Sequence, residues 1–402
     1  MKKFLLSISL LFSLVIMAQD VKKTGNSKSI LEGYYTSGKK LGFTAVDSLF
    51  QMNIGFRVQS RIGYGKEQGK SGVAEGEIRR MRLKLDGFVV SPKFGYKVEL
   101  GFSARDIGTV AVGNSGNVIL DGVFIYQPSS NLKFAFGQTK LPGNNQRVIS
   151  SGSLELTDRS INNSKFNIDR DFGVFVEYGK TKKDKFYYGL KGAISKGEGR
   201  NWVKTSDDGV ALTGKLELFP MGAFTKNGSN FEADLMREKT PKLMLSGAFS
   251  QNNNAQRSQG QLGGSLYEAR TLKSVFVDAV FKYDGWSASG AYMSRTANNP
   301  ITVDALDPTK SHAVFVGHGV DAQLSYVFPS EYQVIGRFST QKVNDAIRTR
   351  TPNTDEYTLG VSKYIFGHKV KVQTEVSYDK IYAYGSSVSN NLFARFQVEI
   401  GL

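Results

Sequence analysis

Three basic residues at two-residue spacing, Arg80, Arg82 and Lys84, are the clearest chemical feature of this 402-residue sequence. On an extended strand, alternate side chains share a face, so these three would form a row with about 7 Å between neighbours. We call this row the basic ladder. Such a ladder attracts anions and replaces part of their hydration shell, and arginine suits oxyanions because its planar guanidinium donates paired hydrogen bonds. Arg79 has the opposite phase and is expected at the rim.

Residues that support enzymatic chemistry are scarce. There is no cysteine, which excludes thiol catalysis, disulfide bonds and cysteine-ligated metal sites. The three histidines, His312, His318 and His368, stand at no motif spacing from a serine or a carboxylate, and we interpret them as solvated loop or turn residues. Asp304 and Asp307 are too sparse for a calcium site. We therefore predict no catalytic residue, no metal site and no cofactor.

The basic ladder lies within a repeated alternation of apolar and polar residues. In the run Phe50–Gln59 every even position is apolar and every odd position is polar or glycine. The final run Arg395–Leu402 alternates in the same way, as do residues 94–103 and 369–378. A period of two indicates β-strands, and no comparable stretch shows the helical period.

The connections between these runs alternate in length. Short ones, such as Ser91–Lys93 and Asp284–Gly285, alternate with long stretches rich in glycine, asparagine and serine. The long stretches lie at about 65–76, 105–117, 140–170, 197–208, 251–271, 296–317, 341–355 and 380–390. Eight long loops separated by seven turns imply about sixteen antiparallel strands, with short periplasmic turns and long extracellular loops, as in outer-membrane barrels. Residues 220–241 break this rule, because a short turn is expected there.

A soluble β-sandwich would also give alternating strands, with one face packed on a core. Several features favour an all-β transmembrane barrel instead. Residues 94–102 carry large apolar side chains at every other position, and the chain ends on an apolar strand residue, Leu402. The mean hydropathy of −0.28 argues against membrane helices. Tyrosines also cluster at strand ends, as in the aromatic girdles of membrane barrels: Tyr126, Tyr178, Tyr283, Tyr326, Tyr364 and Tyr378.

The N-terminus has the pattern of an export signal. Residues 1–18 comprise a basic start, a short apolar core and a small residue, Ala18. A membrane anchor is the alternative, but the core is shorter than the roughly 20 residues that a spanning helix needs. We expect cleavage after Ala18, a flexible periplasmic segment at 19–48 and the barrel at 49–402. Export argues against nucleic acid as a partner, despite the net charge of +16.

Several segments carry recognisable motifs beyond alternation: Ile78–Gly87, Phe94–Lys97, Leu120–Tyr126, Gly137–Gly143, Leu156–Ser160, Arg170–Val174 and, more weakly, Leu216–Pro220 and the final strand. Together they resemble the phosphate-selective porin O and P family. The resemblance implies a sixteen-stranded barrel in the outer membrane of a Gram-negative bacterium and a homotrimer. It also implies loops folded into the pore around an anion-conducting constriction.

If the apolar faces meet lipid, the charged faces line an aqueous lumen. The predicted anion-binding or pore-lining residues are the ladder, three lysines assigned by strand phase and three arginines of the loop 140–170: Arg80, Arg82, Lys84, Lys97, Lys133, Lys215, Arg147, Arg159 and Arg170. The resemblance at Arg159 and Arg170 favours folding of this loop into the pore; decoration of the outer surface is the alternative. Four acidic residues of the same region are expected to pair with the arginines and hold the loop's shape: Glu155, Asp158, Asp169 and Asp171.

The predicted function is therefore passive diffusion of small anions through a porin surrounded by outer-membrane lipid. Phosphate and polyphosphate are substrates that the resemblance implies. A general porin for small hydrophilic solutes is the first alternative, since acidic residues also face the lumen: Glu99, Asp121, Glu217, Glu375 and Glu399. A barrel enzyme or surface-binding protein is the second. It would need a catalytic His/Ser pair at one loop end, and the sequence contains none.

Overall fold

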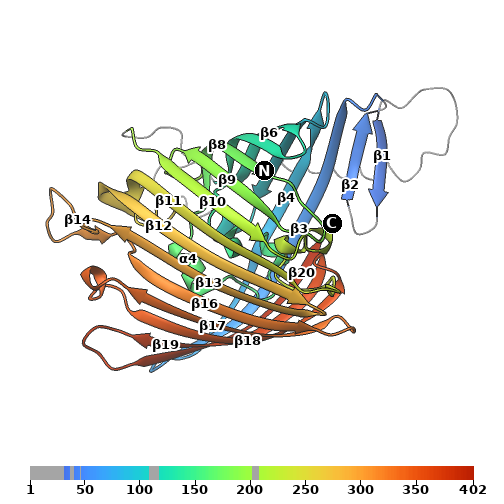
Figure 1. Ribbon diagram of the computed structural model, residues 1–402. Helices are drawn as coiled ribbons and strands as arrows, with labels where there is room; N and C mark the ends of the chain where they lie inside the picture. The colour runs from blue at the N-terminus through green and yellow to red at the C-terminus, as the bar shows by residue number, and fades with distance from the viewer. Residues whose placement is uncertain (1–30, 37–39, 46, 108–116, 202–207) are drawn as a thin grey trace, which may run out of the picture.

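The computed structural model describes residues 31–36, 40–45, 47–107, 117–201 and 208–402, so the expected export signal, 1–18, lies outside the described residues. Within these ranges, eighteen strands form one sheet, in which β1 and β2 make an N-terminal hairpin and the other sixteen close into a barrel (Figure 1). The barrel strands are β3 (Phe50–Glu67), β4 (Val73–Val89), β5 (Phe94–Gly101), β6 (Ile119–Ser129), β7 (Leu132–Lys140), β8 (Arg170–Gly179), β9 (Tyr187–Ser195), β10 (Ala211–Phe219), β11 (Lys242–Arg257), β12 (Ser265–Tyr283), β13 (Trp286–Ala297), β16 (Gly317–Val327), β17 (Tyr332–Val343), β18 (Asn353–Phe366), β19 (Val370–Tyr382) and β20 (Ser389–Gly401). The predicted sixteen-stranded antiparallel barrel is thus confirmed.

The last strand closes the barrel on the first. β20 pairs antiparallel with β3, from Asn391 opposite Glu67 to Gly401 opposite Arg57. Each barrel strand therefore has a hydrogen-bonded neighbour on both sides. This arrangement satisfies the backbone donors and acceptors without water, as a bilayer requires of strands.

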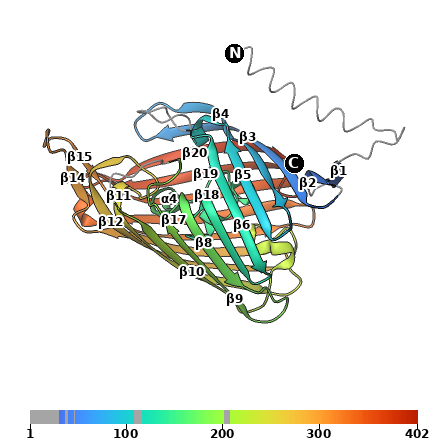
Figure 2. The ribbon, with the colours of Figure 1, turned by 90° about the horizontal axis from the view of Figure 1, so that it is seen from above.

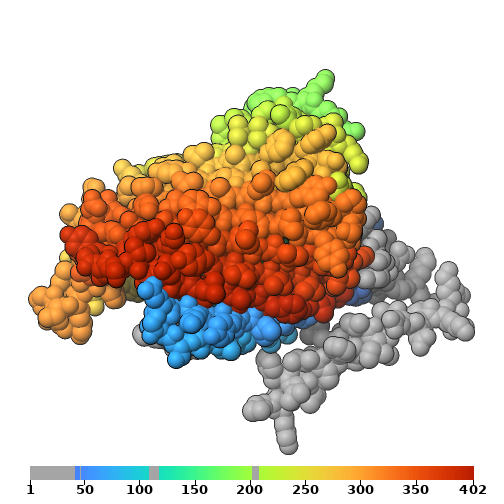
Figure 3. Space-filling model, turned by 90° about the horizontal axis from the view of Figure 1, so that it is seen from below, coloured from blue at the N-terminus to red at the C-terminus, as the bar shows by residue number. Residues whose placement is uncertain are grey.

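The predicted alternation sorts side chains between two faces. On β16, Val320 and Leu324 are exposed on the outer face, whereas Asp321 and Gln323 are buried on the inner face. Figure 3 shows the outer wall of the C-terminal strands as a continuous surface in orange and red. No helix among the described residues is long and apolar enough to span a membrane.

The short connections gather at one end of the barrel, the turn end, and most longer ones at the other, the loop end. At the loop end, the connection from β13 to β16 contains a small hairpin, β14 (Ile301–Val303) and β15 (Ser311–Ala313), which projects beyond the barrel in Figures 1 and 3. Two expected long loops are shorter than predicted, because β3 and β4 extend to residues 67 and 73, and β11 and β12 to residues 257 and 265. The residues at these strand ends are polar and include glycine, yet they pair as regular β-strands.

The N-terminal segment 19–48, expected to be flexible, is described at residues 31–36, 40–45 and 47–48. Its described part contains β1 (Leu31–Thr36) and β2 (Lys40–Ala45), which pair with each other. β2 also pairs with β3, with Leu41 opposite Ile54 and Thr44 opposite Gln51. The hairpin thus covers the part of the β3 edge that lies beyond the end of β20.

Two connections enter the barrel. The first, residues 141–169 between β7 and β8, is called the inward loop, and it contains three short helices: α3 (Asn145–Val148), η1 (Ser151–Ser153) and α4 (Ile161–Phe166). The second, residues 220–241 between β10 and β11, is called the inserted segment, and it contains η2 (Thr225–Asn230). Figure 2 shows α4 inside the ring of strands. Two other short helices, α2 (Ala104–Ile107) and η3 (Asp345–Ile347), belong to loop-end connections.

An apolar cluster inside the barrel anchors the inward loop. Leu141, Phe166 and Ile168 of the loop pack in one buried cluster with wall residues that include Phe276 and Met293. Fully burying a large apolar side chain stabilises a fold by roughly 1.5–3 kcal/mol. These residues therefore favour an inner position for a loop whose length alone would also allow a surface position.

Gly137 on β7 is a position where the barrel requires glycine. Its φ is +128°, and an added Cβ would lie 2.2 Å from the Gly122 carbonyl oxygen. Gly137→Ala is therefore expected to destabilise the barrel by roughly 1–3 kcal/mol, measured as a lower urea midpoint of unfolding. Gly214→Ala on β10 is the matched control, because an added Cβ there meets no atom within 4 Å. Equal midpoints for the two variants would contradict this reading.

Candidate pore and constriction

The basic ladder lies on the inner face of β4 as predicted, but a β-bulge lies next to Arg80. Gln59 pairs with Arg80 and Ser60 pairs with Ile78, so Arg79 is an extra residue of β4 in the pairing of β3 with β4. A bulge lets adjacent side chains point the same way. Arg79 therefore reaches the lumen beside Arg80, and its expected place at the rim was wrong.

Asp158 of the inward loop binds this cluster of arginines. Its carboxylate accepts hydrogen bonds from Arg79 Nη2 at 2.8 Å and Arg80 Nη2 at 3.0 Å, and also from Arg61 on β3. Burial alone would raise the pKa of Asp158, but Arg80 and Arg79 outweigh it and hold the pKa well below its usual range. Asp158 is thus a permanent counter-charge shared by three arginines, as expected of a residue that holds the loop's shape.

The rest of the ladder is also paired. Arg82 donates to Asp106 of α2, with Nη2–Oδ1 at 2.6 Å, and to Glu99 of β5 at 3.1 Å. Lys84 lies 3.0 Å from Asp86, but 45% of its side chain is exposed. The two arginine forks are therefore occupied by carboxylates, whereas the lysine remains in contact with water.

Two of the three predicted arginines, Arg147 and Arg159, bind groups of the inward loop, whereas Arg170 begins β8 and binds Asp121 on β6. Arg147 Nε donates to Asp169 at 2.9 Å, and Arg170 Nε donates to Asp121 at 2.8 Å. Arg159 donates to the carbonyl oxygens of Gln146 and Ile149, each at 2.7 Å. Lys215, also predicted to line the pore, is fully buried beside Glu217 on β10, with their side-chain atoms 3.3 Å apart. The structure therefore places these four residues inside the barrel, in contacts that fix the loop and the wall.

The inward loop lies against the wall formed by β16–β20. Glu155 accepts hydrogen bonds from Gln323 on β16 and Gln333 on β17. Lys371 on β19 donates to the carbonyl oxygens of Gly152 and Leu154 at 3.1 and 2.6 Å. These contacts join residues more than 160 positions apart in the chain, and they place the loop inside the barrel rather than on its surface.

A solvent-filled cavity remains on the opposite side, along β4–β9. It measures about 1150 Å³, including the solvent at its open sides. Among the described residues that line it, six are basic and two are acidic: Arg82, Lys84, Lys97, Lys133, Lys140 and Lys191 against Glu99 and Glu177. We call this cavity the basic passage. A second cavity, of about 1270 Å³, adjoins it towards the turn end and shares Lys133, Glu177 and Lys191 in its lining.

Three lysines of the basic passage are partly exposed and also ion-paired, whereas Lys140 donates to the carbonyl oxygens of Val148 and Ile149 at 3.0 and 3.1 Å. The exposed fraction of the side chain is 27% for Lys97, 35% for Lys133 and 26% for Lys191. Their ammonium groups lie 2.6, 2.7 and 2.8 Å from the carboxylates of Asp121, Glu177 and Glu217. Partly exposed ion pairs of this kind contribute little to stability.

Sequence reasoning missed Lys191 and the role of the inserted segment. Lys191 has the inner phase on β9, and its neighbour Leu190 faces outward, so alternation could have found it. His368, expected to be solvated, lies against Phe231 of the inserted segment with ring centroids 4.7 Å apart. Tyr364, expected in the girdle, is fully buried inside and donates to Gln333. No local pattern marks these contacts, because their partners are distant in the chain.

Comparison with known proteins agrees with this architecture. The family model of phosphate-selective porin O and P matches residues 50–399, and the chain belongs to this family. The structure is similar to the outer-membrane channel DcaP of Acinetobacter baumannii at 15% identity, covering 90% of this chain and 99% of that one with a TM-score of 0.56. OprB of Pseudomonas putida follows at 10% identity, 87% and 94% coverage and a TM-score of 0.55. An anion-selective porin from Comamonas acidovorans shows 10% identity, 87% and 99% coverage and a TM-score of 0.53. No curated protein matches the chain in sequence.

The family and the barrel identify an outer-membrane channel of a Gram-negative bacterium. In such barrels the short turns face the periplasm and the longer loops face the outside. The inward loop enters from the loop end and the inserted segment from the turn end, which by this rule is the end expected to face the periplasm.

The first prediction for this site concerns Asp158. Asp158→Asn keeps the side-chain shape but leaves Arg61, Arg79 and Arg80 without their shared counter-charge. The anion-to-cation permeability ratio should rise roughly a few-fold, measured from the reversal potential in a KCl gradient. Asp307→Asn in the exposed β14–β15 hairpin is the control and should leave the ratio unchanged. An unaltered ratio in a folded, conducting Asp158 variant would show that these arginines do not act on the permeating ion.

The second prediction concerns Glu155. Burial, reinforced by the nearby Glu232 carboxylate, raises the pKa of Glu155 to about 7. A raised pKa means that the folded state holds the proton more tightly, so this contribution is complete below the ordinary pKa near 4.5 and is lost as pH rises through about 7. The Tm should fall between pH 5 and pH 8 by an amount equivalent to about 1–3 kcal/mol. Glu155→Gln should remove most of this slope, and an identical slope in the variant would assign it to other groups.

Proposed function

We propose that this chain is a passive channel through which small anions diffuse preferentially along the basic passage. The observation that carries the proposal is the lining of that passage, where basic side chains outnumber acidic ones six to two among the described residues. A pore wall of one predominant charge concentrates the opposite ion and lowers the cost of its partial dehydration. The family and the fold point to a channel rather than to an enzyme.

The chemistry of the wall favours a general preference for anions over a strict phosphate filter. Tight phosphate recognition uses arginine forks that are free to donate paired hydrogen bonds. In this chain Arg80 and Arg82 donate to carboxylates, and the groups exposed to the solvent of the passage are lysines. Lysine acts on an anion as a hydrated point charge. Phosphate and polyphosphate are therefore proposed as members of a broader class of permeating anions.

A general porin for small hydrophilic solutes is the second candidate. It is favoured by the carboxylate partner that each of Lys97, Lys133 and Lys191 has. The family resemblance and the apolar outer wall support a homotrimer embedded in outer-membrane lipid, which we include in the proposal. A barrel enzyme has no specific observation in its favour.

The proposal is tested by removing the charge of two lysines of the basic passage and measuring ion selectivity. Lys133→Gln combined with Lys191→Gln removes two positive charges from the passage while leaving the inward loop untouched. The proposal expects anion preference in the unmodified channel and a roughly two-fold or larger loss of that preference in the variant, read from reversal potentials in asymmetric KCl.

A matched control is Lys310→Gln, because Lys310 is exposed on the β14–β15 hairpin and pairs only locally with Asp307. This variant should keep the original reversal potential. Cation preference or zero selectivity in the unmodified channel would reject the anion hypothesis in favour of the general porin.

A further inference from the structure

The inserted segment, 220–241, is an unusual periplasmic connection. The neighbouring strands β12 and β13 are joined by Asp284 and Gly285 alone, whereas β10 and β11 are joined by this whole segment. It does not project away from the barrel but contacts the inner wall and the inward loop. It therefore occupies part of the lumen.

A buried lysine holds the backbone of the inserted segment. Lys282 on β12 is 1% exposed, and its Nζ donates to the carbonyl oxygens of Gly228, Phe231 and Ala233 at 2.9, 2.8 and 2.9 Å. An ammonium group has three hydrogens, so all its donors are used on this segment. Lys282 therefore fixes the backbone of residues 228–233 inside the barrel.

Side chains of the inserted segment fix its other end. The Asp234 carboxylate accepts from the backbone N–H groups of Glu238 and Gly285, at 3.0 and 2.9 Å. Arg237 donates to the Val327 and Asp284 carbonyl oxygens at 2.6 and 3.0 Å. These bonds reach two neighbouring turns, so the segment is tied to the rim as well as to the wall.

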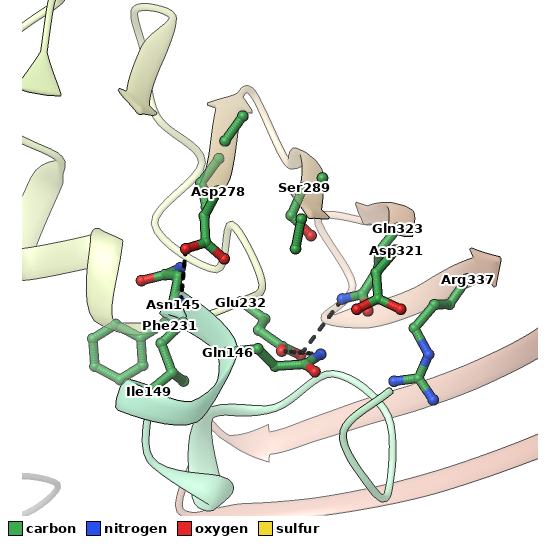
Figure 4. Close-up of a pocket in the computed structure, with 14 residues that line it drawn as sticks. Asn145, Gln146, Ile149, Phe231, Glu232, Asp278, Ser289, Asp321, Gln323 and Arg337 are labelled. Atoms are coloured by element: carbon green, nitrogen blue, oxygen red, sulfur yellow. Dashed lines mark hydrogen bonds between the residues drawn. The ribbon is translucent and has the colours of Figure 1, made fainter. Parts of the chain in front are cut away.

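The tip of the inserted segment joins the inward loop. The Glu232 N–H donates to the Ser153 carbonyl oxygen at 3.1 Å, and the Glu155 N–H donates to the Glu232 carboxylate at 2.8 Å. Gln146 Nε2 donates to the same carboxylate at 3.2 Å, and Ser287 Oγ on β13 donates to the Glu232 carbonyl oxygen at 2.6 Å. Figure 4 shows Glu232 facing Gln146 of the loop and Gln323 of the wall. The two connections, which enter from opposite ends, therefore meet at Glu232.

We propose that the inserted segment is a fixed periplasmic plug that continues the inward loop into one partition and confines permeation to the basic passage. The space left at their junction is about 510 Å³ and is lined by both connections and the wall, whereas about 1150 Å³ is open on the β4–β9 side. The segment would thus set the size limit of the channel, and Phe224 and Asn227 of the segment also line the second cavity, which continues the basic passage at the turn end. This inference rests on the proposed channel function but not on its selectivity.

The first experiment replaces residues 223–237 with a two-residue Asp-Gly turn like that between β12 and β13. Single-channel conductance should rise roughly two-fold, because a second route in parallel adds its conductance to the first. Removing residues 304–310 from the β14–β15 hairpin is the matched control and should not change conductance. A folded deletion variant with unchanged conductance would overturn the plug. Ion selectivity is read separately from reversal potentials, so failure of the anion hypothesis would be distinguishable from failure of this one.

A second experiment uses the absence of native cysteine and leaves the segment in place. In Ser287→Cys the thiol lies beneath Glu232 and should be protected from a charged methanethiosulfonate reagent added to liposome-embedded channels. Adding Lys282→Met removes the ammonium group that holds the segment and should increase the labelling rate roughly ten-fold or more. Ser330→Cys on the exposed turn between β16 and β17 is the reactive control. Equal labelling of Ser287→Cys and Ser330→Cys without the Lys282 change would show that the segment does not cover the wall.

Discussion

The absence of water in the bilayer is the constraint on which the rest of this structure depends. Strands can cross such a medium only as a closed ladder, and closure through the pairing of β20 with β3 leaves no free edge within the barrel. Closure in turn divides every strand into an outer apolar face and an inner polar face. Charged residues on the inner face must then find partners in a confined space, and the two inward connections supply many of those partners.

The basic residues of the lumen fall into two groups, which differ in burial and in the groups they bind. One group is buried and holds backbone: Lys282, Lys371 and Arg295 each donate to carbonyl oxygens of the inserted segment or the inward loop. The other group comprises Lys97, Lys133 and Lys191, whose side chains are partly exposed in the basic passage. Lys140 also lines the passage but belongs to the first group, because it donates to the carbonyl oxygens of Val148 and Ile149. A formal count of charge does not separate these groups. Arg80 and Arg82, whose guanidinium groups could bind phosphate, instead donate hydrogen bonds to carboxylates of the protein.

The fold was predictable from sequence because its determinants are local. Alternation and turn length give the strand number and the inner face of Arg80, Arg82 and Lys84. The extra residue at Arg79 was not predictable, because a bulge depends on the register of the partner strand. Nor were the roles of Arg159 and the inserted segment, whose partners lie far away in the chain or are backbone carbonyls that leave no mark in the sequence. Such pairings become visible only when the barrel is closed.

The long reach of the inward loop constrains the order in which the molecule assembles. The loop is synthesised between β7 and β8, yet Lys371, which donates to Leu154, follows 217 residues later. Until β16–β20 are in place, the carbonyl oxygens of Gly152 and Leu154 and the Glu155 carboxylate lack their wall partners, whereas Asp158 can already bind the arginines of β3 and β4. Docking of the part of the loop around Leu154 must therefore follow the addition of the last strands, so the loop is fixed to the barrel in at least two stages.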